Sequence, residues 1–517
     1  MNTIRINHRL RYLRNRITTG LLLALLSSSS LLPAASPQLS EFETPPDQYR
    51  PRFYWFWMGG SMTKEGIRAD LEAMKEVGVG GVLMMNVYPT APLDITCMGD
   101  KWWDLLTYAN TEAQRNNILF GTHNCPGWST SGGPWNTVEN SMQKVVFTET
   151  EHLGPGKLTA PLPQAEVDER WNYYRDIVVY AIQDAKSGTV PREHVIDVSK
   201  YMNDDGTLGW EAPAGEWTLY RFGHTTTGHM NGPPIKGGQG LESDKMSREA
   251  TKIHFDSYAK KIIDRMQPLV GETFNNFELD SYEAGQQNWT PKYREEFMQR
   301  RGYDPLPWFP ALAGVTVGDA DQTARFNRDM AKTISDLFVE NHYQYLAELC
   351  NENGVTMDYE AYGGPFDPLA AGGAADMPMG ECWTGKMGWS TVTLAVSAAH
   401  THGRPVIGCE ALTSTPMHSQ WKQTPYSIKA FADRAFAMGI NMMVLHCYAQ
   451  QPWDHVAPGM SMNFWGTHFS RTNTWWDYSK PWFDYLARCQ FMLQQGMPVV
   501  DICVLGTNVP GGMPEGY

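Results

Sequence analysis

Short apolar runs alternate with amphipathic stretches along the first part of the chain. The runs at 53–57, 80–85 and 118–122 have the length and apolar character of buried strands. The stretches between them, 64–77 and 102–116, repeat apolar side chains at helical spacing. Because strands that alternate with helices pair side by side in the same direction, this order predicts a parallel sheet.

The pattern changes between residues 141 and 247, where strands and turns follow one another without intervening helices. The expected strands cover 144–151, 176–183, 194–198 and 216–225. Consecutive strands joined by short turns pair in opposite directions. We therefore expect an inserted, mostly antiparallel β-domain after the third strand.

After the insertion, the strand and helix alternation resumes and supplies five more strands, at 275–279, 356–359, 377–381, 405–410 and 442–446. Helices are expected at 248–266, 293–301, 325–353, 390–402, 425–438 and 482–495. Eight strands with helices between them predict an α/β fold, a (β/α)8 TIM-like barrel. The barrel would then be formed by residues 37–140 and 248–496. An apolar run at 499–505 reads as a new strand, so 497–517 are expected to begin a further, truncated domain.

The first 36 residues have the layout of a secretory signal peptide. Five arginines precede the apolar run 21–26, and the small residues 34–36 suit cleavage. This apolar core is too short to span a bilayer, and no later run of about 18 apolar residues follows it. We therefore expect a secreted or periplasmic protein without a membrane span.

Composition narrows the possible partners. The 517 residues carry a formal net charge of −14, which argues against nucleic acid or an anionic membrane as the main partner. The eight cysteines have no CxxC spacing, so a zinc ribbon or a thioredoxin-type site is not expected. Most of these thiols read as small buried hydrophobes, with an isolated disulfide left open.

Polar and aromatic residues follow the predicted strands, and in a barrel such residues meet at one mouth. They are Trp57, Asn86, His123, Asn124, Trp128, Glu278, Asp280, Glu283, Glu360, Glu381, Glu410 and His446. Four consecutive strands end in glutamate, at 278, 360, 381 and 410. Unpaired acids in these positions cost desolvation, although any single one could pair with an arginine.

Paired carboxyl groups that face a cleft are what glycoside hydrolysis needs. One protonates the leaving oxygen, and the second activates water or attacks the sugar. Tryptophan and asparagine side chains around them can stack on sugar rings and bind hydroxyl groups. His446 fits a sugar contact and a buried structural histidine equally well.

Several ordered motifs resemble glycoside hydrolase family 106, a family of α-L-rhamnosidases. They are 56–67 (FWMGGSMTKEGI), 124–135 (NCPGWSTSGGPW), 278–283 (ELDSYE), 381–383 (ECW), 446–452 (HCYAQQP), 474–476 (TWW) and 488–490 (RCQ). Each motif alone is weak, but together they run in order over nearly the whole chain after the leader.

The resemblance implies a catalytic (β/α)8 barrel, inversion at the anomeric carbon and assistance by calcium. The family's acid and base map onto Glu278 and Glu410, and Glu381 is the expected calcium ligand or sugar-hydroxyl acceptor. The expected sugar contacts are Trp57, Asn86, His123, Asn124, Trp128, Asp280, Glu283, Glu360, Trp383 and His446. The expected function is release of terminal α-L-rhamnose from plant glycans of the pectin type.

Three alternatives remain beside this reading. A retaining β-glycosidase of the β-galactosidase kind also uses glutamates after strands four and seven, with carboxyl groups about 5 Å apart rather than about 6.5–9.5 Å. A non-catalytic carbohydrate-binding protein would hold glycan in the same mouth without cleaving it. A metal-dependent hydrolase is disfavoured because the sequence has no HExxH motif.

Overall fold

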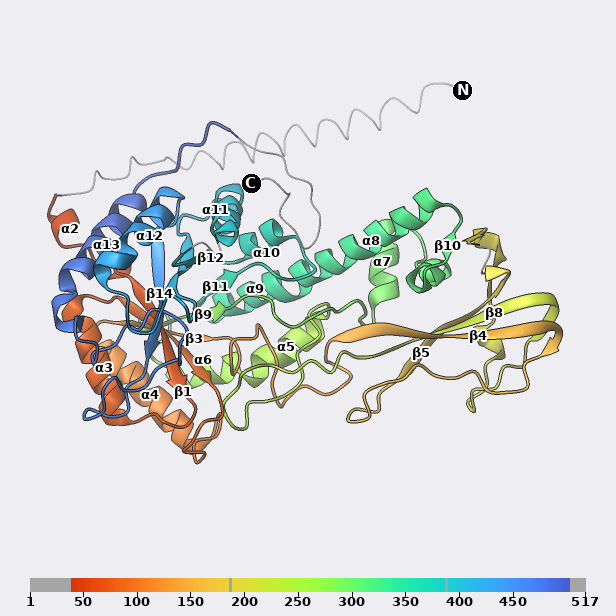
Figure 1. The fold of residues 1–517 in the computed structure, drawn as a ribbon, viewed down its shortest axis with the longest axis horizontal. Coiled ribbons are helices and arrows are strands. Elements are labelled where there is room, and N and C mark those ends of the chain that lie inside the picture. The colour runs from red at the N-terminus through yellow and green to blue at the C-terminus, as the bar shows by residue number, and fades with distance from the viewer. Residues whose placement is uncertain (1–38, 186–187, 386–388, 503–517) are drawn as a thin grey trace, which may run out of the picture. The chain divides into compact units, whose positions relative to one another are not determined.

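The computed structural model describes residues 39–185, 188–385 and 389–502. Eight parallel strands form a closed barrel, which confirms the predicted fold class (Figure 1). In chain order they are β1 (Arg52–Met58), β2 (Gly81–Val87), β3 (Leu119–His123), β9 (Phe274–Leu279), β11 (Thr356–Glu360), β12 (Met377–Trp383), β13 (Gly408–Thr413) and β14 (Met442–Ala449). Closure occurs where β1 pairs with both β2 and β14.

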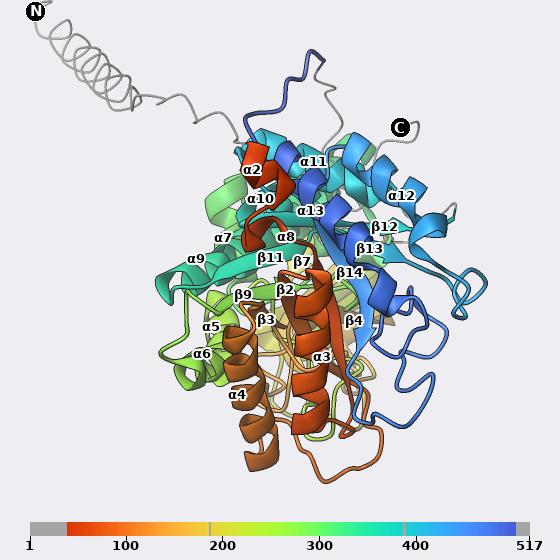
Figure 2. The ribbon, with the colours of Figure 1, turned by 90° about the vertical axis from the view of Figure 1, so that its left-hand side faces the viewer.

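Helices follow the strands, and Figure 2 shows α3 and α4 side by side on the outside of the barrel. The helices of residues 44–502 are α3 (Lys64–Val77), α4 (Asp100–Arg115), α5 (Arg248–Ser257), α6 (Ala259–Met266), α7 (Tyr293–Arg301), α8 (Ala320–Phe338), α9 (Gln344–Glu352), α10 (Pro368–Ala374), α11 (Ser390–His402), α12 (Pro425–Ala437) and α13 (Lys480–Leu493). A short helix, α2 (Leu39–Glu43), belongs to a separate unit of the chain.

Helix α3 illustrates how the sequence sets these boundaries. The Thr63 hydroxyl accepts a hydrogen bond from the Gly66 amide and caps the first turn. Ile67 and Leu71, one turn apart, are buried against the barrel. The helix ends at Gly78, whose φ of 94° lies in the left-handed region that glycine adopts without strain.

A four-stranded antiparallel sheet lies between β3 and β9 in the chain, as expected. It consists of β4 (Gln143–Lys157), β5 (Arg175–Gln183), β7 (Val195–Asp197) and β8 (Glu211–Thr226), in the order β4-β8-β5-β7. Figure 1 shows β4, β5 and β8 running alongside one another as long ribbons. The stem of the sheet, where β4 begins and β8 ends, is the register pair Gln143 and Thr226.

Several contacts attach the inserted region to the helical layer, among them a ring contact and a short strand pair. The rings of Phe222 and Phe309 pack edge to face with centroids 5.6 Å apart. The short strands β6 (Thr189–Val190) and β10 (Thr316–Val317) pair in parallel. The described residues from Thr44 onward form one compact unit.

Side chains alternate between two cores along each barrel strand. In β1, Trp55 and Trp57 belong to the large core outside the barrel, and Tyr54 and Phe56 belong to the core inside it. The same alternation directs Glu410 inward, between the outward Cys409 and Ala411. This parity decides which residues reach the mouth.

Some predicted elements differ in the structure. The helix expected at 325–353 is two helices, α8 and α9, joined by a π-helical turn at Val339–Tyr343. Strand β13 lies three residues later than expected, and α10 had not been predicted. Residues 499–502 form no strand, and the rest of the run to 505 lies outside the described residues, as does the leader 1–36.

No helix among the described residues is long and apolar enough to cross a membrane. The seven cysteines of the described ranges are free thiols, and five of them are buried.

Candidate active site

Three glutamates lie on the inner face of the barrel near the carboxyl ends of its strands. Glu278 ends β9, Glu360 ends β11 and Glu410 lies in β13. Glu278 and Glu360 are fully buried, and Glu410 keeps 6% of its surface exposed. The barrel therefore brings together three of the four glutamates expected at its mouth in an enclosed site.

Tyr54 links two of these carboxyl groups. Its hydroxyl oxygen lies 3.2 Å from Oε1 of Glu278 and 2.9 Å from Oε1 of Glu360. A tyrosine hydroxyl has one proton to donate, so it can satisfy only one carboxylate as donor. The second contact requires a proton on the other carboxyl group. The geometry thus favours a site in which at least one of the two glutamates is neutral.

The second carboxyl oxygen of Glu278, Oε2, is buried and is unpaired within the described ranges. Among the described residues, Oε2 has no hydrogen-bond partner, and its nearest basic atom is Nε2 of His123 at 3.7 Å. That nitrogen accepts a hydrogen bond from the Asp280 amide, and Nδ1 lies 3.1 Å from the Cys125 carbonyl oxygen and 3.3 Å from the Cys125 amide nitrogen. Burial lowers the pKa of His123 to about 4, so the imidazole is neutral at pH 7.

The acids raise one another's pKa values. Burial raises the pKa of Glu278 well above its ordinary range, and the charges of Asp280, Asp358 and Glu410 add to the effect. Burial also raises the pKa of Glu410, with Glu381 and Asp280 adding to it. Perturbed carboxyl groups enclosed in one site are typical of acid–base catalysis.

A hard cation fits part of this cluster. Asp280, Glu360 and Glu410 each offer a carboxylate oxygen, and these three oxygens lie within 4.8 Å of one another. An all-oxygen donor set of this kind suits Ca²⁺. Glu381 does not belong to this group of three; its Oε2 accepts a hydrogen bond from Nε1 of Trp383 at 2.6 Å.

The structure places Trp128 and Glu283 together at the rim. Nε1 of Trp128 donates to Oε2 of Glu283 at 3.2 Å, and the Trp128 ring packs edge to face on Tyr88 at 5.7 Å. Ser281 donates to the other carboxylate oxygen of Glu283. Because Glu283 is exposed, this pair remains accessible from solvent.

The expectation that Trp57 and Asn86 face the mouth is wrong. Trp57 is fully buried in the outer core and packs edge to face on Trp55 at 5.5 Å. The Asn86 amide donates to the Trp57 carbonyl at 2.8 Å and accepts from Trp102 of α4. Both residues occupy outward positions. The sequence could not predict this, because a strand that is buried on both faces has no alternation of polar and apolar residues that would distinguish them.

Asn124 and His446 differ in their surroundings. The Asn124 amide donates to the Thr130 carbonyl at 2.9 Å and approaches His254, so it holds the loop after β3. His446 faces the barrel interior, where its ring packs against Tyr54 and Phe56. Burial lowers the pKa of His446 to about 3, and no described residue hydrogen bonds its Nδ1.

Sequence reasoning missed three hydroxyl groups that hold the carboxylates. They belong to Tyr54, to Tyr362, which donates to Glu360, and to Thr413, which donates to Glu410. Tyr54 shares the inward parity of Phe56, and Tyr362 and Thr413 stand two and three residues after their glutamates. A hydroxyl residue two or three positions after a strand-end glutamate was the sequence signal that could have identified the last two.

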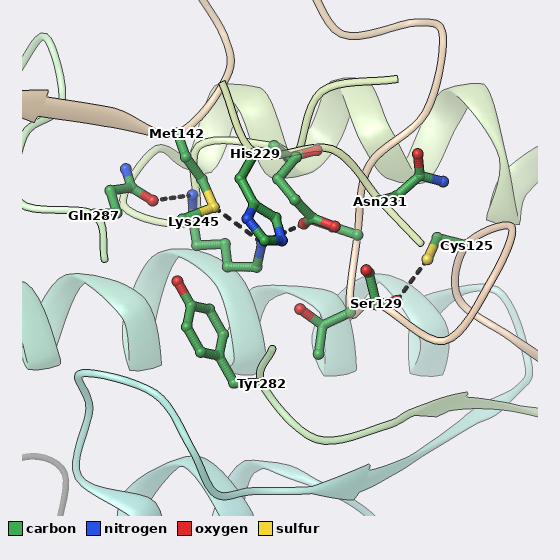
Figure 3. A network of polar contacts seen from close by, with 12 residues as sticks. Cys125, Ser129, Met142, His229, Asn231, Lys245, Tyr282 and Gln287 are labelled. Atoms are coloured by element: carbon green, nitrogen blue, oxygen red, sulfur yellow. Dashed lines mark hydrogen bonds and ion pairs between the residues drawn. The ribbon is translucent and has the colours of Figure 1, made fainter. Parts of the chain in front are cut away.

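Behind the site, a buried ion pair lies in the segment between β8 and α5. Nζ of Lys245 lies 2.6 Å from Oε2 of Glu242, and both side chains are fully buried. Glu242 also accepts from the Ser131 hydroxyl at 2.8 Å. Figure 3 shows Lys245 between Met142 and the ring of Tyr282, whose centroid lies 5.6 Å from Nζ.

Comparison with known proteins agrees with this geometry. A rhamnosidase from Novosphingobium sp. PP1Y has a similar structure, with a TM-score of 0.81 and 26% sequence identity over 89% of this chain and 61% of that one. A Formosa agariphila protein named "Putative beta-glucuronidase" is 37% identical over 94% of this chain and 44% of its own length. The chain thus spans less than two thirds of either relative.

The family model described as α-L-rhamnosidase, glycoside hydrolase family 106, matches residues 43–169 and 164–510. These ranges contain every barrel strand and all the carboxyl groups of the site. The chain therefore belongs to glycoside hydrolase family 106.

Proposed function

We propose that the protein releases terminal α-L-rhamnose from glycans with inversion at the anomeric carbon, using Glu278 as general acid and Glu410 as general base. The observation that carries the assignment of the acid is the enclosure of Glu278, whose Oε2 lacks a hydrogen-bond partner among the described residues. A proton held there has no protein acceptor and is available to a glycosidic oxygen.

Tyr54 supports this proton location. When a protonated Glu360 donates to the Tyr54 oxygen, the Tyr54 hydroxyl donates to Oε1 of Glu278 and leaves the Glu278 proton on Oε2. Burial and the neighbouring acids raise the pKa of Glu278, which favours its protonated form. Glu278 transfers this proton to the departing oxygen as the glycosidic bond breaks.

Glu410 suits the opposite task. Its Oε1 accepts a hydrogen bond from Thr413, which fixes the carboxylate, and its residual exposure lets water approach. Glu410 removes a proton from that water as the oxygen attacks the anomeric carbon from the face opposite Glu278. The products are β-L-rhamnose and the shortened glycan.

The expected calcium ion would be held by Asp280 and Glu360 beside Glu410, and Glu381 remains a predicted ligand. When bound, the ion would supply positive charge that lowers the pKa of Asp280, Glu360 and Glu410, which favours an ionised base, and would offer a site for sugar hydroxyls.

A β-glucuronidase, the activity in the name of the Formosa agariphila protein, is the second candidate. A glucuronide carries a carboxylate that needs a cationic partner. Among the described residues, the side chains that hydrogen bond Glu278, Glu360, Glu381 and Glu410 are hydroxyl and indole groups. This acidic surrounding favours a neutral sugar.

Proton NMR of an aryl α-L-rhamnoside during hydrolysis, with calcium present, tests the proposal. Early β-rhamnose is expected, and Glu278→Gln and Glu410→Gln should each abolish it. Glu348→Gln, an exposed carboxylate, is the matched control. Early α-rhamnose would contradict inversion, and turnover of an aryl β-glucuronide instead would support the second candidate.

We further propose that the enzyme is exported and acts on pectin-type plant glycans. The basic leader with its short apolar core supports export. Fractionation of expressing cells, followed by N-terminal sequencing of the extracellular or periplasmic protein, checks both export and cleavage near residue 36.

A further inference from the structure

Exposed aromatic side chains gather on two loops that follow the last two barrel strands. Trp421 lies in the loop after β13, and Phe464 and Trp465 lie in the loop after β14; their exposed fractions are 40%, 50% and 45%. Apolar surface of this kind is costly in water and often marks a binding site. We call these three residues the aromatic platform.

The two loops hold each other in place. The Gly466 amide donates to the Ser414 carbonyl at 2.8 Å, and the Ser419 hydroxyl donates to the Phe464 carbonyl. The Trp421 ring stacks on His468 with centroids 4.0 Å apart and planes 21° from parallel. These contacts fix the aromatic rings on a hydrogen-bonded support, so a ligand would pay little entropy to order them.

The platform continues into the mouth of the barrel. The ring of Trp465 packs edge to face on Trp383, with centroids 6.1 Å apart. Trp383 donates to Glu381, and Glu381 is the register partner of Glu410. A continuous path of contacts therefore leads from the candidate base to the exposed indoles.

We propose that the aromatic platform binds the sugar units on the leaving-group side of the scissile bond, so that the enzyme acts on glycans longer than a disaccharide. This inference rests on the proposed function. Because the acidic side chains are buried, the terminal sugar must enter the barrel while the rest of the glycan projects past the rim.

The chemistry of the platform suits this ligand. One face of a pyranose ring exposes mainly C–H groups, which pack on an indole while the hydroxyl groups at the ring edge stay hydrated. Indole rings supply a large, rigid contact area at small entropic cost.

The test compares two substrates, methyl α-L-rhamnoside and a neutral trisaccharide that ends in α-L-rhamnose. The variant is Trp465→Ala combined with Phe464→Ala. Tyr201→Ala, which removes a 40% exposed aromatic residue from the inserted sheet region, is the matched control. The platform variant should lose about tenfold more kcat/KM on the trisaccharide than on the methyl glycoside, mainly through KM.

Equal losses on both substrates would overturn the inference, since a structural disturbance would affect both. If the parent chain hydrolyses neither substrate, the proposed function fails and calorimetric titration decides on the platform alone. The platform variant should then bind the trisaccharide about tenfold more weakly than the parent chain, with L-rhamnose affinity less affected. A trisaccharide affinity that is unchanged in the variant, or that equals the rhamnose affinity in the parent chain, would also overturn it.

Discussion

Tyr54 contacts two carboxyl groups of the site through a single hydroxyl. Tyr54→Phe keeps the ring in the inner core and removes only that oxygen. A buried hydrogen bond to a charged group contributes about 1.5–3 kcal/mol, so kcat on an aryl rhamnoside should fall about ten- to a hundredfold. The KM should change less, because the sugar does not need this hydroxyl to enter. An unchanged kcat would contradict the role, and Tyr220→Phe in the inserted sheet is the control.

His254 should make the fold sensitive to acid. It is fully buried between Asn124 and Trp135, and burial lowers its pKa from the ordinary 6.5 to about 3. The unfolded chain therefore binds the proton first. The contribution of His254 is complete above about pH 6.5 and falls by about 1.4 kcal/mol per pH unit as the pH drops toward 3.

Urea unfolding at pH 7 and pH 5 measures this contribution. Between these values the parent chain should lose about 2 kcal/mol more than His254→Gln. The exposed His194→Gln serves as the control for removing an imidazole. Identical pH dependence of the parent chain and His254→Gln would exclude the effect.

At the residue scale, the sequence predicted which acids lie at the strand ends, but not which face of a strand each side chain occupies. Glu278, Glu360 and Glu410 come together as expected, because a carboxyl end is a position along the strand and needs no knowledge of its faces. The outward direction of Trp57 and Asn86 could not be predicted, because the strands that carry them are apolar on both faces.

The segment between β8 and α5 holds the buried Lys245–Glu242 pair, and Ser131 of the loop after β3 donates to it (Figure 3). Lys245→Met leaves Glu242 as an unpaired buried charge, which should lower the free energy of unfolding by about 3–5 kcal/mol. Lys245→Met combined with Glu242→Gln should lose less, because no charge is left behind. Denaturant unfolding of the three proteins checks this order. A double variant less stable than Lys245→Met would contradict it.

At the element scale, periodicity predicted helices best where a glycine in the left-handed region ends them. The bounds of α3, α7 and α11 agree with the expected ranges. The π-helical turn between α8 and α9 escaped prediction, because its side chains keep an unbroken apolar face. The apolar pattern also misplaced β13. The expected strand, 405–410, includes Pro405 and Ile407, whereas β13 begins after them, at Gly408.

At the scale of the whole molecule, a bound cation should raise stability by mass action. Calcium at about a hundred times its Kd should add about 2.7 kcal/mol to the free energy of unfolding and raise Tm. Asp280→Asn should reduce that rise, since it removes one of the three clustered carboxylates. Differential scanning fluorimetry with CaCl₂ against NaCl of equal ionic strength tests it. A Tm unaffected by calcium and by chelator would contradict the cation site.

Chain order predicted the barrel and the inserted sheet together, because a run of turn-linked strands stands apart from strands separated by helices. The contacts that join the two could not be read in this way. The pairing of β6 with β10 involves two residues on each side, too few to give a pattern.

The stem formed by Gln143 and Thr226 also bears on how the chain folds. Strands β3 and β9 are neighbours in the barrel, yet a long stretch of sequence separates them. If β4 and β8 pair first, most of that stretch is already folded when β3 pairs with β9. The loop that must then close between β3 and β9 is much shorter. The entropic cost of closing a loop grows with its length. Early folding of the inserted sheet should therefore lower the entropic cost of barrel closure.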